Sequence, residues 1–317
     1  MSAPTVDSLF RPVIEAAIGT IWQQWADLGG TATGGETRRW LIDPEALLLA
    51  SEALAPRERR LHEVYFMWVR QHADVLSVQR LTNLSNHTGT LPQHHPEAIA
   101  AIAMQGPNGH RWKKLAGTTP PSAPSSLHLR SAPPLGLSAP STAMLRLRLA
   151  MGVGVKADAL TYLLGTHEWR SVQEVTRATG YTPAGVRRSL DELAEARFIE
   201  SEDGVAWHAR RARNYRADPK LYRTLLGLGS MPPAWGYFRE RFDFVVHLSQ
   251  WMDDGNGMQQ WNSVQLGDWA KIWMKQHLLA FTINGKERAA FRGNLEEWGA
   301  HFQESLHALA EWFGGKE

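Results

Sequence analysis

The sequence predicts a mainly α-helical protein in which a central unit of three helices and a β-hairpin is flanked by N- and C-terminal helical regions. Toward both ends of the chain, large apolar residues recur every three or four positions, which is the spacing of one face of a helix. In the centre, short segments with that spacing are followed by alternating apolar and polar residues, which are typical of strands. Capping and turn residues separate these segments.

Composition narrows the classes of protein to consider. The chain has 317 residues, enough for two or three units with their own cores, and a net charge of +2 with neutral histidines. It has no cysteine, which excludes disulfides, thiolate metal sites and cysteine nucleophiles. No apolar run is long enough to cross a bilayer, and the first residues lack the pattern of a signal peptide. We therefore expect a cytoplasmic protein without a membrane contact.

Residues 1–104 are predicted to form an N-terminal helical domain. Apolar residues at helical spacing mark one helix over residues 14–28, which two glycines end. Asp43 and Pro44 begin a second helix, because the aspartate can accept hydrogen bonds from free N–H groups and proline fits the first turn. Further helices are expected over residues 57–72, 75–84 and 95–104.

The composition changes sharply between residues 105 and 142. Prolines recur among serine, glycine and threonine, and the charged residues are Arg111, Lys113, Lys114 and Arg130. Prolines cannot donate the hydrogen bonds of a regular element. We therefore interpret this stretch as a basic Pro/Ser-rich linker or long loop between two domains.

Residues 143–226 begin with two short helices. Residues 157–164 have the spacing of the first helix, and Ser171 can cap the second. Gly180 ends the second helix, because glycine adopts a positive φ without steric cost. A tight turn is therefore expected at this glycine.

A third helix follows the turn. Thr182 is its N-cap, Pro183 lies in its first turn, and Tyr181 can pack on Val186 as a hydrophobic staple. The residues expected on its buried face are Val186, Leu190 and Leu193. The residues left pointing outward are Arg187, Arg188, Asp191 and Glu192.

A β-hairpin is expected after the third helix. Phe198 and Ile199 begin a strand, the pair Asp203-Gly204 is a turn signal, and residues 205–209 alternate along a return strand. A second version of this hairpin remains open, in which the strands extend further and Arg210 to Arg213 form the tip.

Helix, helix, tight turn, helix and hairpin, in that order, describe a winged helix-turn-helix. Residues 171–201, SVQEVTRATGYTPAGVRRSLDELAEARFIES, resemble the reading head of the MarR- and ArsR-type bacterial transcriptional regulators. The resemblance implies that the helix from Thr182 to Ala196 enters the major groove, and that the wing, from Glu202 to Arg213, contacts the DNA backbone. It covers under a third of the chain. The flanking helical regions depart from the plan of those families, so no ligand or metal site is carried over.

Basic residues agree with this placement. Arginines on the outer side of the third helix can reach guanine edges or phosphates, and a basic run beyond the hairpin suits phosphate contacts. Acidic neighbours dilute the positive charge of this region. The residues predicted to contact DNA are Thr182, Ala184, Arg187, Arg188, Asp191, Arg210, Arg211, Arg213, Tyr215 and Arg216.

The C-terminal region, residues 227–317, shows three apolar helical stripes rich in aromatic residues. The last stripe runs from Phe291 to Trp312, close to the end of the sequence, and we expect it to hold a homodimer that matches a two-fold DNA site. In the competing interpretation, this stripe packs on residues 235–248 and 261–279 of the same chain.

The expected function is sequence-specific binding of double-stranded DNA to control transcription of the chain's own or a neighbouring operon. In the alternative, the chain is an interaction subunit or antitoxin-like partner whose winged helix contacts another protein. No motif of an enzyme occurs, so we expect neither an enzyme nor a cofactor. His94 and His95 beside Glu97 lack further ligands at a recognised spacing. We expect them in a solvent-exposed loop and predict no metal site.

Overall fold

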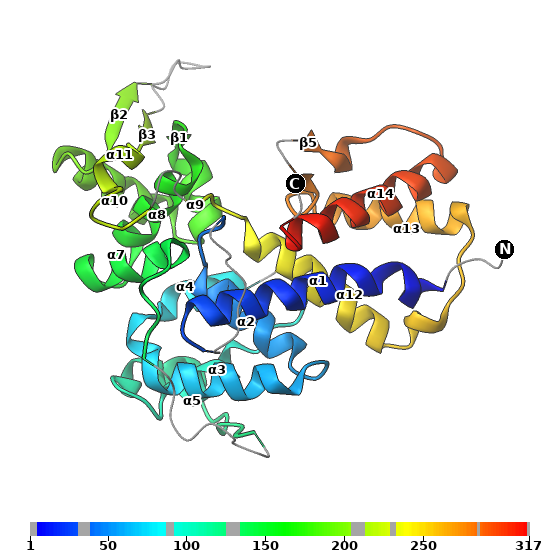
Figure 1. Cartoon of the computed structure of the whole chain (residues 1–317), viewed down its shortest axis with the longest axis horizontal. Coiled ribbons are helices and arrows are strands. Elements are labelled where there is room, and N and C mark those ends of the chain that lie inside the picture. The colour runs from blue at the N-terminus through cyan, green and yellow to red at the C-terminus, as the bar shows by residue number, and fades with distance from the viewer. Residues whose placement is uncertain are drawn as a thin grey trace.

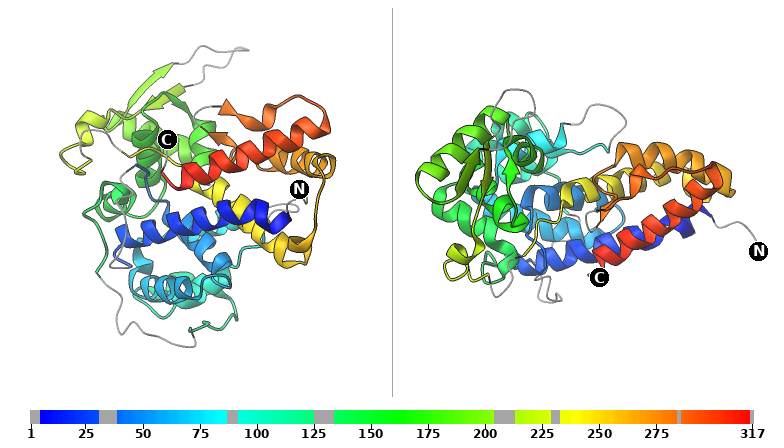
Figure 2. Two further views of the ribbon diagram at one scale, coloured as in Figure 1. Left: turned by 45° about the vertical axis from the view of Figure 1, so that its right-hand side comes forward. Right: turned by 90° about the horizontal axis from the view of Figure 1, so that it is seen from above.

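The computed structural model describes residues 5–30, 39–86, 92–124, 134–203, 213–228, 233–283 and 286–315. Within these ranges the protein is mainly helical, with fourteen α-helices and five short strands. Figure 1 shows the helices arranged as a large body and a smaller unit, and Figure 2 gives two further views. No helix in these ranges is both long and apolar enough to cross a membrane.

The large body combines helices from both ends of the chain. The N-terminal helices are α1 (Val6–Asp27), α2 (Pro44–Leu54), α3 (Arg59–His72), α4 (Val78–Ser85), α5 (Pro96–Ala103) and α6 (Lys113–Ala116). The C-terminal helices are α12 (Phe238–Asp253), α13 (Ser263–Gln276) and α14 (Leu295–Phe313). Helix α14 packs on α1 and α13, and α12 packs on α2, so the two sets share one cluster of buried apolar side chains (Figure 1).

The smaller unit contains the remaining helices and a three-stranded antiparallel sheet. Its elements are α7 (Ala143–Met151), α8 (Val155–Thr166), β1 (Arg170–Ser171), α9 (Val172–Thr179), α10 (Pro183–Glu195), β2 (Glu200–Asp203), β3 (Arg213–Arg216) and α11 (Pro219–Tyr222). The strand order is β1-β3-β2. Helices α8, α9 and α10 pack on one another around a second apolar cluster.

Short 3₁₀ segments and a second pair of strands lie between the longer elements. The 3₁₀ segments are η1 (Ala73–Val75), η2 (Gly109–Trp112), η3 (Pro140–Thr142), η4 (Asn256–Met258) and η5 (Arg288–Ala290). Strands β4 (Thr282–Ile283) and β5 (Lys286–Glu287) pair between α13 and α14.

The capping residues of the smaller unit act as the sequence predicts. Ser171 caps α9, and the Glu174 carboxylate accepts a hydrogen bond from the Ser171 N–H at 2.8 Å, which completes a capping box. Gly180 ends α9 with a φ of +74°. Thr182 then caps α10, and the predicted buried face of Val186, Leu190 and Leu193 is confirmed.

The predicted turn of the hairpin is wrong. Asp203 pairs with Arg213, and Glu200 pairs with Arg216, so the strand that pairs with β2 is β3. A two-residue turn at Asp203-Gly204 would pair Glu202 with position 205, whereas Glu202 pairs with Asn214. The second version of the hairpin is also wrong, because Arg213 lies in β3 and not in the tip. The connection between the two strands, residues 204–212, lies outside the described residues.

The expectation that the stretch between residues 105 and 142 holds no regular element is wrong. The segment η2 and helix α6 lie within it, and the Trp112 side chain is fully buried in the large body. Burial of one large aromatic side chain is enough to order a short segment of this kind. Residues 125–133 lie outside the described residues.

The apolar stripe of α14 is covered by the same chain. Its buried side chains include Trp298, Phe302, Leu309 and Trp312, and the Thr20 hydroxyl of α1 donates to the Phe313 carbonyl at 2.7 Å. Phe291 precedes the helix and is partly buried. The contacts with α1 and α13 account for the burial of the stripe on which the dimer expectation was based.

Candidate nucleic-acid interface

Helix α10 presents the first set of residues predicted to contact DNA. The Thr182 hydroxyl accepts a hydrogen bond from the Gly185 N–H at 3.3 Å, so this side chain holds the start of the helix. Thr182, Ala184, Arg187 and Arg188 are all exposed. Neither arginine forms a side-chain hydrogen bond or an ion pair with any residue of the described ranges. Two guanidinium groups are therefore open to solvent on the outer side of α10.

Asp191 and Tyr215 bind each other. The Tyr215 hydroxyl donates to Asp191 Oδ1 at 2.7 Å, and Arg213 Nη1 donates to the same oxygen at 3.1 Å. Tyr215 is only 1% exposed, and burial together with the hydrogen bond to Asp191 raises its pKa to about 12. These contacts fasten β3 to α10, which is a structural role that sequence analysis does not anticipate for either residue.

The basic run after the hairpin is described in part. Arg210 and Arg211 lie outside the described residues. Arg216 Nη2 lies 2.6 Å from Glu200 Oε2, and its guanidinium lies 4.7 Å from the centroid of the Trp169 ring. Carboxylates therefore offset part of the charge of Arg213 and Arg216 and hold both side chains along the sheet.

Beneath this surface, a set of buried charges lies where the smaller unit meets the large body. We call Asp43, Glu45, Arg80, Arg148 and Asp158 the buried ion network, since each of these side chains is at most 4% exposed. Arg80 lies 2.5 Å from Asp43 and 2.6 Å from Glu45. Arg148 lies 2.7 Å from Glu45 and 2.7 Å from Asp158. The network thus joins α2 and α4 of the body to α7 and α8.

The network also reaches the turn that precedes α10. The Tyr181 hydroxyl donates to Asp158 Oδ2 at 2.8 Å. In the same turn, the Gly180 carbonyl accepts a hydrogen bond from Asn83 Nδ2 of α4 at 2.8 Å. The start of α10 is therefore held in a fixed orientation by both units of the protein.

The buried ion network is not predicted above, although the sequence contains a usable signal for it. Arg148 lies in the apolar segment AMLRLRLAM, and Asp158 lies in the apolar segment KADALTYLL. A charged residue within an apolar helix is seldom fully buried unless it has a partner. The partner itself could not be predicted, because Arg148 and Glu45 are 103 residues apart in the sequence.

The prediction of an exposed loop is wrong for His94. Its side chain is 1% exposed and its Nε2 lies 2.9 Å from Asp243 Oδ1 on α12, whereas His95 is exposed beside Glu97. A carboxylate partner makes burial of the imidazole favourable. No group of three or more histidine, aspartate or glutamate side chains that could hold a metal ion occurs in the described ranges.

Comparison with models of known protein families, with curated proteins and with solved structures finds no match for this chain. Any assignment of function therefore depends on the chain's own geometry. The relevant features are the exposed arginine pair on α10, the adjoining three-stranded sheet, and the contacts that fix both to the large body.

Proposed function

We propose that the chain is a sequence-specific DNA-binding regulator of transcription, acting on its own or a neighbouring operon. In this proposal residues 155–216 form a winged helix-turn-helix. The order α8, β1, α9, α10, β2, β3, with three helices packed on one another, supports it. In such units the second helix of the pair lies in the major groove, with the neighbouring elements on the DNA backbone.

The observation that carries the proposal is the pair Arg187 and Arg188. Both side chains are exposed on the helix that would enter the groove, and neither is neutralised by a carboxylate of the described residues. Arginine binds guanine through two hydrogen bonds, and one such contact contributes about 1–3 kcal/mol of discrimination. An exposed arginine pair without ionic partners is therefore available for base recognition.

A mobility-shift assay with fragments of the genome that encodes the chain tests the proposal. We expect one or a few fragments to shift, and Arg187→Ala with Arg188→Ala to weaken that binding about thirty-fold or more. Helicity and melting temperature are expected to stay the same, since both side chains are exposed. The matched control is Arg59→Ala with Arg60→Ala, an exposed arginine pair at the start of α3.

Each outcome distinguishes the alternatives. Equal DNA affinity in the α10 variant and in the wild type would reject α10 as the reading helix. Failure of every fragment to shift would favour the other candidate function, in which this unit contacts a protein. Equal weakening by the α3 control would show that general positive charge, and not the reading helix, supplies the affinity.

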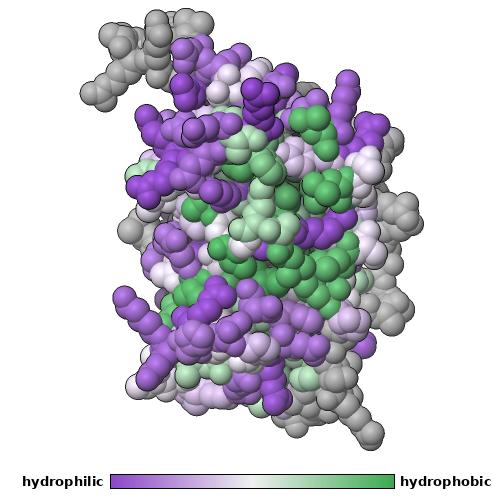
Figure 3. All heavy atoms as spheres, turned by 90° about the vertical axis from the view of Figure 1, so that its left-hand side faces the viewer, coloured by the Kyte–Doolittle hydropathy of each residue, from purple (hydrophilic) through white to green (hydrophobic). Residues whose placement is uncertain are grey.

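An exposed apolar face supports a protein contact in addition to DNA. Leu149 of α7 and Leu221 and Leu225 in and after α11 are 53%, 66% and 73% exposed. Gly227, which follows them, lies beside Arg146 of α7, so the two segments adjoin. Figure 3 looks at the side of the molecule that carries α7 and α11 and shows apolar side chains gathered across the middle of this face. Apolar side chains this exposed are typical of interaction sites.

We propose that Leu149, Leu221 and Leu225 form the contact between two copies of the chain, because a reading helix that covers a few base pairs is usually doubled across a two-fold axis and the stripe of α14 is already buried within the chain. Sedimentation at micromolar concentration is expected to show a dimer of the 35.5 kDa chain, and Leu221→Asp with Leu225→Asp to yield a folded monomer. A wild-type chain that sediments as a monomer would refute the dimer. A dimer that survives both substitutions would place the contact elsewhere.

A further inference from the structure

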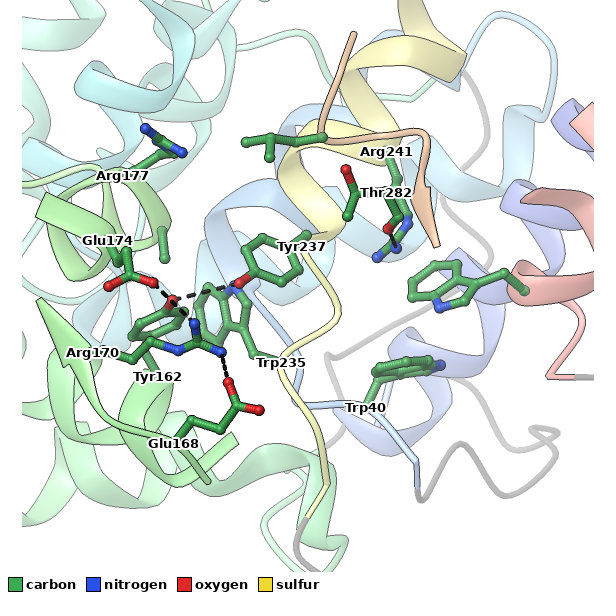
Figure 4. A pocket seen from close by; sticks show the side chains of 13 residues that line it. Trp40, Tyr162, Glu168, Arg170, Glu174, Arg177, Trp235, Tyr237, Arg241 and Thr282 are labelled. Atoms are coloured by element: carbon green, nitrogen blue, oxygen red, sulfur yellow. Dashed lines mark hydrogen bonds and ion pairs between the residues drawn. The ribbon is translucent and has the colours of Figure 1, made fainter. Parts of the chain in front are cut away.

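A pocket of about 450 Å³ lies between the smaller unit and the large body. One wall comes from β1 and α9, with Arg170 and Arg177, and the opposite wall comes from α12 and α14, with Arg241 and Trp312. Trp40, which precedes α2, closes the same side as α14. Figure 4 shows the two walls facing each other across the cavity. A volume of this size suits a small organic molecule.

Five of the residues that line the cavity are aromatic and five are charged. The rings of Trp40 and Trp312 lie 4.7 Å apart, and the rings of Tyr162 and Trp235 meet edge to face at 5.3 Å. Tyr237 lies between these pairs (Figure 4). Flat apolar surfaces on both sides favour a planar apolar group in the space between them.

Tyr237 also has an unusual backbone. Its φ is +48°, a left-handed conformation that bulky residues rarely adopt. Backbone strain of this kind is found most often at ligand sites, where the surrounding structure maintains it. Here it directs the Tyr237 hydroxyl to 3.5 Å from the hydroxyl of Tyr162 at the pocket wall.

Arg241 places a buried positive charge in the cavity. The residue is 4% exposed, and its guanidinium donates to the carbonyls of Gly236 and Thr282 and lies 3.7 Å from the centroid of the Trp312 ring. Burial lowers its pKa to about 10, so it remains charged at neutral pH. The charge of the neighbouring Glu240 acts on Arg241, but within the described ranges no carboxylate forms an ion pair with it, and its Nε has no hydrogen-bond partner. A buried cation without an anion is costly to maintain.

The other two arginines of the pocket differ from each other. Arg170 lies 2.5 Å from Glu168 and 2.9 Å from Glu174, so its charge is neutralised. Arg177 is exposed at the pocket and forms no ion pair with any residue that the structure describes. Arg241 inside the cavity and Arg177 at its edge are therefore two cations that form no ion pair with a described residue, and the three arginines of the lining exceed its two glutamates by one positive charge.

We propose that this pocket binds a small planar organic anion, an aromatic ring that bears a carboxylate. The carboxylate would pair with Arg241, with Arg177 as a second cation, and the ring would lie against Trp40 and Tyr237. Because the walls belong to α9 and α12, such a ligand contacts both units of the protein. Since α10 packs on α9, binding would change the orientation or mobility of α10. An effect of the ligand on DNA affinity is the one part of this inference that depends on the proposed function.

Calorimetric titration of the protein without DNA tests the site. Naphthoate is the probe, and the neutral amide of the same ring is the control for charge. We expect naphthoate to bind and the amide to bind about tenfold more weakly or worse, because the amide leaves Arg241 unpaired. Arg177→Gln is expected to weaken naphthoate binding severalfold, Arg241→Met to weaken it about tenfold or more, and Arg241→Lys to weaken it less than Arg241→Met.

Controls keep the result interpretable. Arg292→Gln, an exposed arginine that does not line the pocket, is expected to bind naphthoate as the wild type does. Urea unfolding shows whether the Arg241→Met variant folds. Because Arg177 is exposed, Arg177→Gln is expected to fold and tests the site even if Arg241→Met does not fold. The proposal is overturned if naphthoate fails to bind at millimolar concentration, or if naphthoate and its amide bind equally well. It is also overturned if Arg177→Gln and the folded Arg241→Met variant bind naphthoate as the wild type does.

A mobility shift with and without naphthoate then tests regulation separately. We expect naphthoate to change DNA affinity for the wild type and to have no effect on Arg241→Met. If no DNA fragment shifts, the proposed function fails while the calorimetric result for the pocket still stands.

Discussion

At the scale of single residues, the buried ion network is the feature with the largest energetic consequence. Two guanidinium groups and three carboxylates are almost completely buried, so each depends on its neighbours for hydrogen bonds. Glu45 lies in the first turn of α2 and also accepts a hydrogen bond from the Ser77 N–H at 2.8 Å. The positive end of the helix dipole and this N–H help to stabilise the extra negative charge.

Removing Arg148 should therefore be far more costly than removing a neighbouring arginine. Arg148→Met leaves Glu45 and Asp158 buried with only Arg80 nearby, and breaking a buried pair in this way costs about 3–5 kcal/mol. The matched control is Arg146→Met on the same helix, because Arg146 is half-buried and, among the described residues, donates to the carbonyls of Ala139 and Pro140 and to no carboxylate. Urea unfolding measures the free energy of unfolding of both variants. A similarly small loss of stability in Arg148→Met and Arg146→Met would contradict this role for the network.

The same network predicts sensitivity to acid. Burial favours the neutral carboxyl, but the charges of Arg148 and Arg80 outweigh burial and lower the pKa of Glu45 from 4.5 to about 2. Since the folded pKa is the lower one, the unfolded chain takes up the proton first. The contribution of Glu45 to stability is therefore complete above about pH 4.5 and is lost as the pH falls toward 2.

Urea unfolding at a series of pH values from 6 to 3 checks this expectation. Across its whole window Glu45 contributes on the order of 3 kcal/mol. Glu45→Gln is expected to be less stable than the wild type at pH 6, and to lose less of its remaining stability on acidification. If both proteins lost stability with the same steepness, the acid sensitivity would come from other carboxylates.

At the scale of elements, local signals predicted most of the longer helices, missed α6 and α7, and did not predict the strand pairing. Asp43, Ser171 and Thr182 cap the helices that the sequence predicts, because a cap bonds only to residues two or three positions away. The hairpin register depends on which residues face each other across a long connection, so the turn signal at Asp203-Gly204 was misleading. Tyr215 illustrates the same limit at the site, since its burial against α10 follows from that register.

The turn between α9 and α10 gives a prediction at this scale. Gly180 has a φ of +74°, and an added Cβ would lie 2.9 Å from Leu84 Cδ2. Gly180→Ala is therefore expected to destabilise the protein by about 1–2 kcal/mol. Gly19 is the opposite case, because it lies within α1 with nothing within 4 Å of an added Cβ. Gly19→Ala should stabilise the protein by about 0.5–1 kcal/mol.

Urea unfolding of the two alanine variants, side by side, measures this difference in sign. Circular dichroism of the folded variants confirms that helix content is kept. A stabilising effect of Gly180→Ala would show that the turn does not require the left-handed conformation.

At the scale of the whole molecule, the two ends of the chain form one core. Helix α1 packs on α14, and α2 packs on α12, so the N-terminal helices depend on helices near the other end of the sequence. Periodicity identifies the apolar face of each helix and says nothing about which face meets which. For that reason the sequence left open whether the last stripe packs within the chain or against a second copy.

Removal of α14 tests the dependence of the body on its last helix. The backbones of α13 and α14 approach closely, since an added Cβ on Gly267 would overlap the Leu295 carbonyl, and one on Gly299 would lie 2.6 Å from the Ser263 carbonyl. Truncation after Gly285 uncovers the apolar faces of α1 and α13 that α14 packs against, and burial of each large side chain is worth about 1.5–3 kcal/mol. We expect the truncated chain to lose cooperative thermal unfolding, including in its N-terminal helices, whereas truncation after Gly315 leaves the transition unchanged. A soluble truncated chain that still unfolds in one sharp transition would show that α14 is peripheral, and would return its apolar stripe to consideration as a contact between two copies.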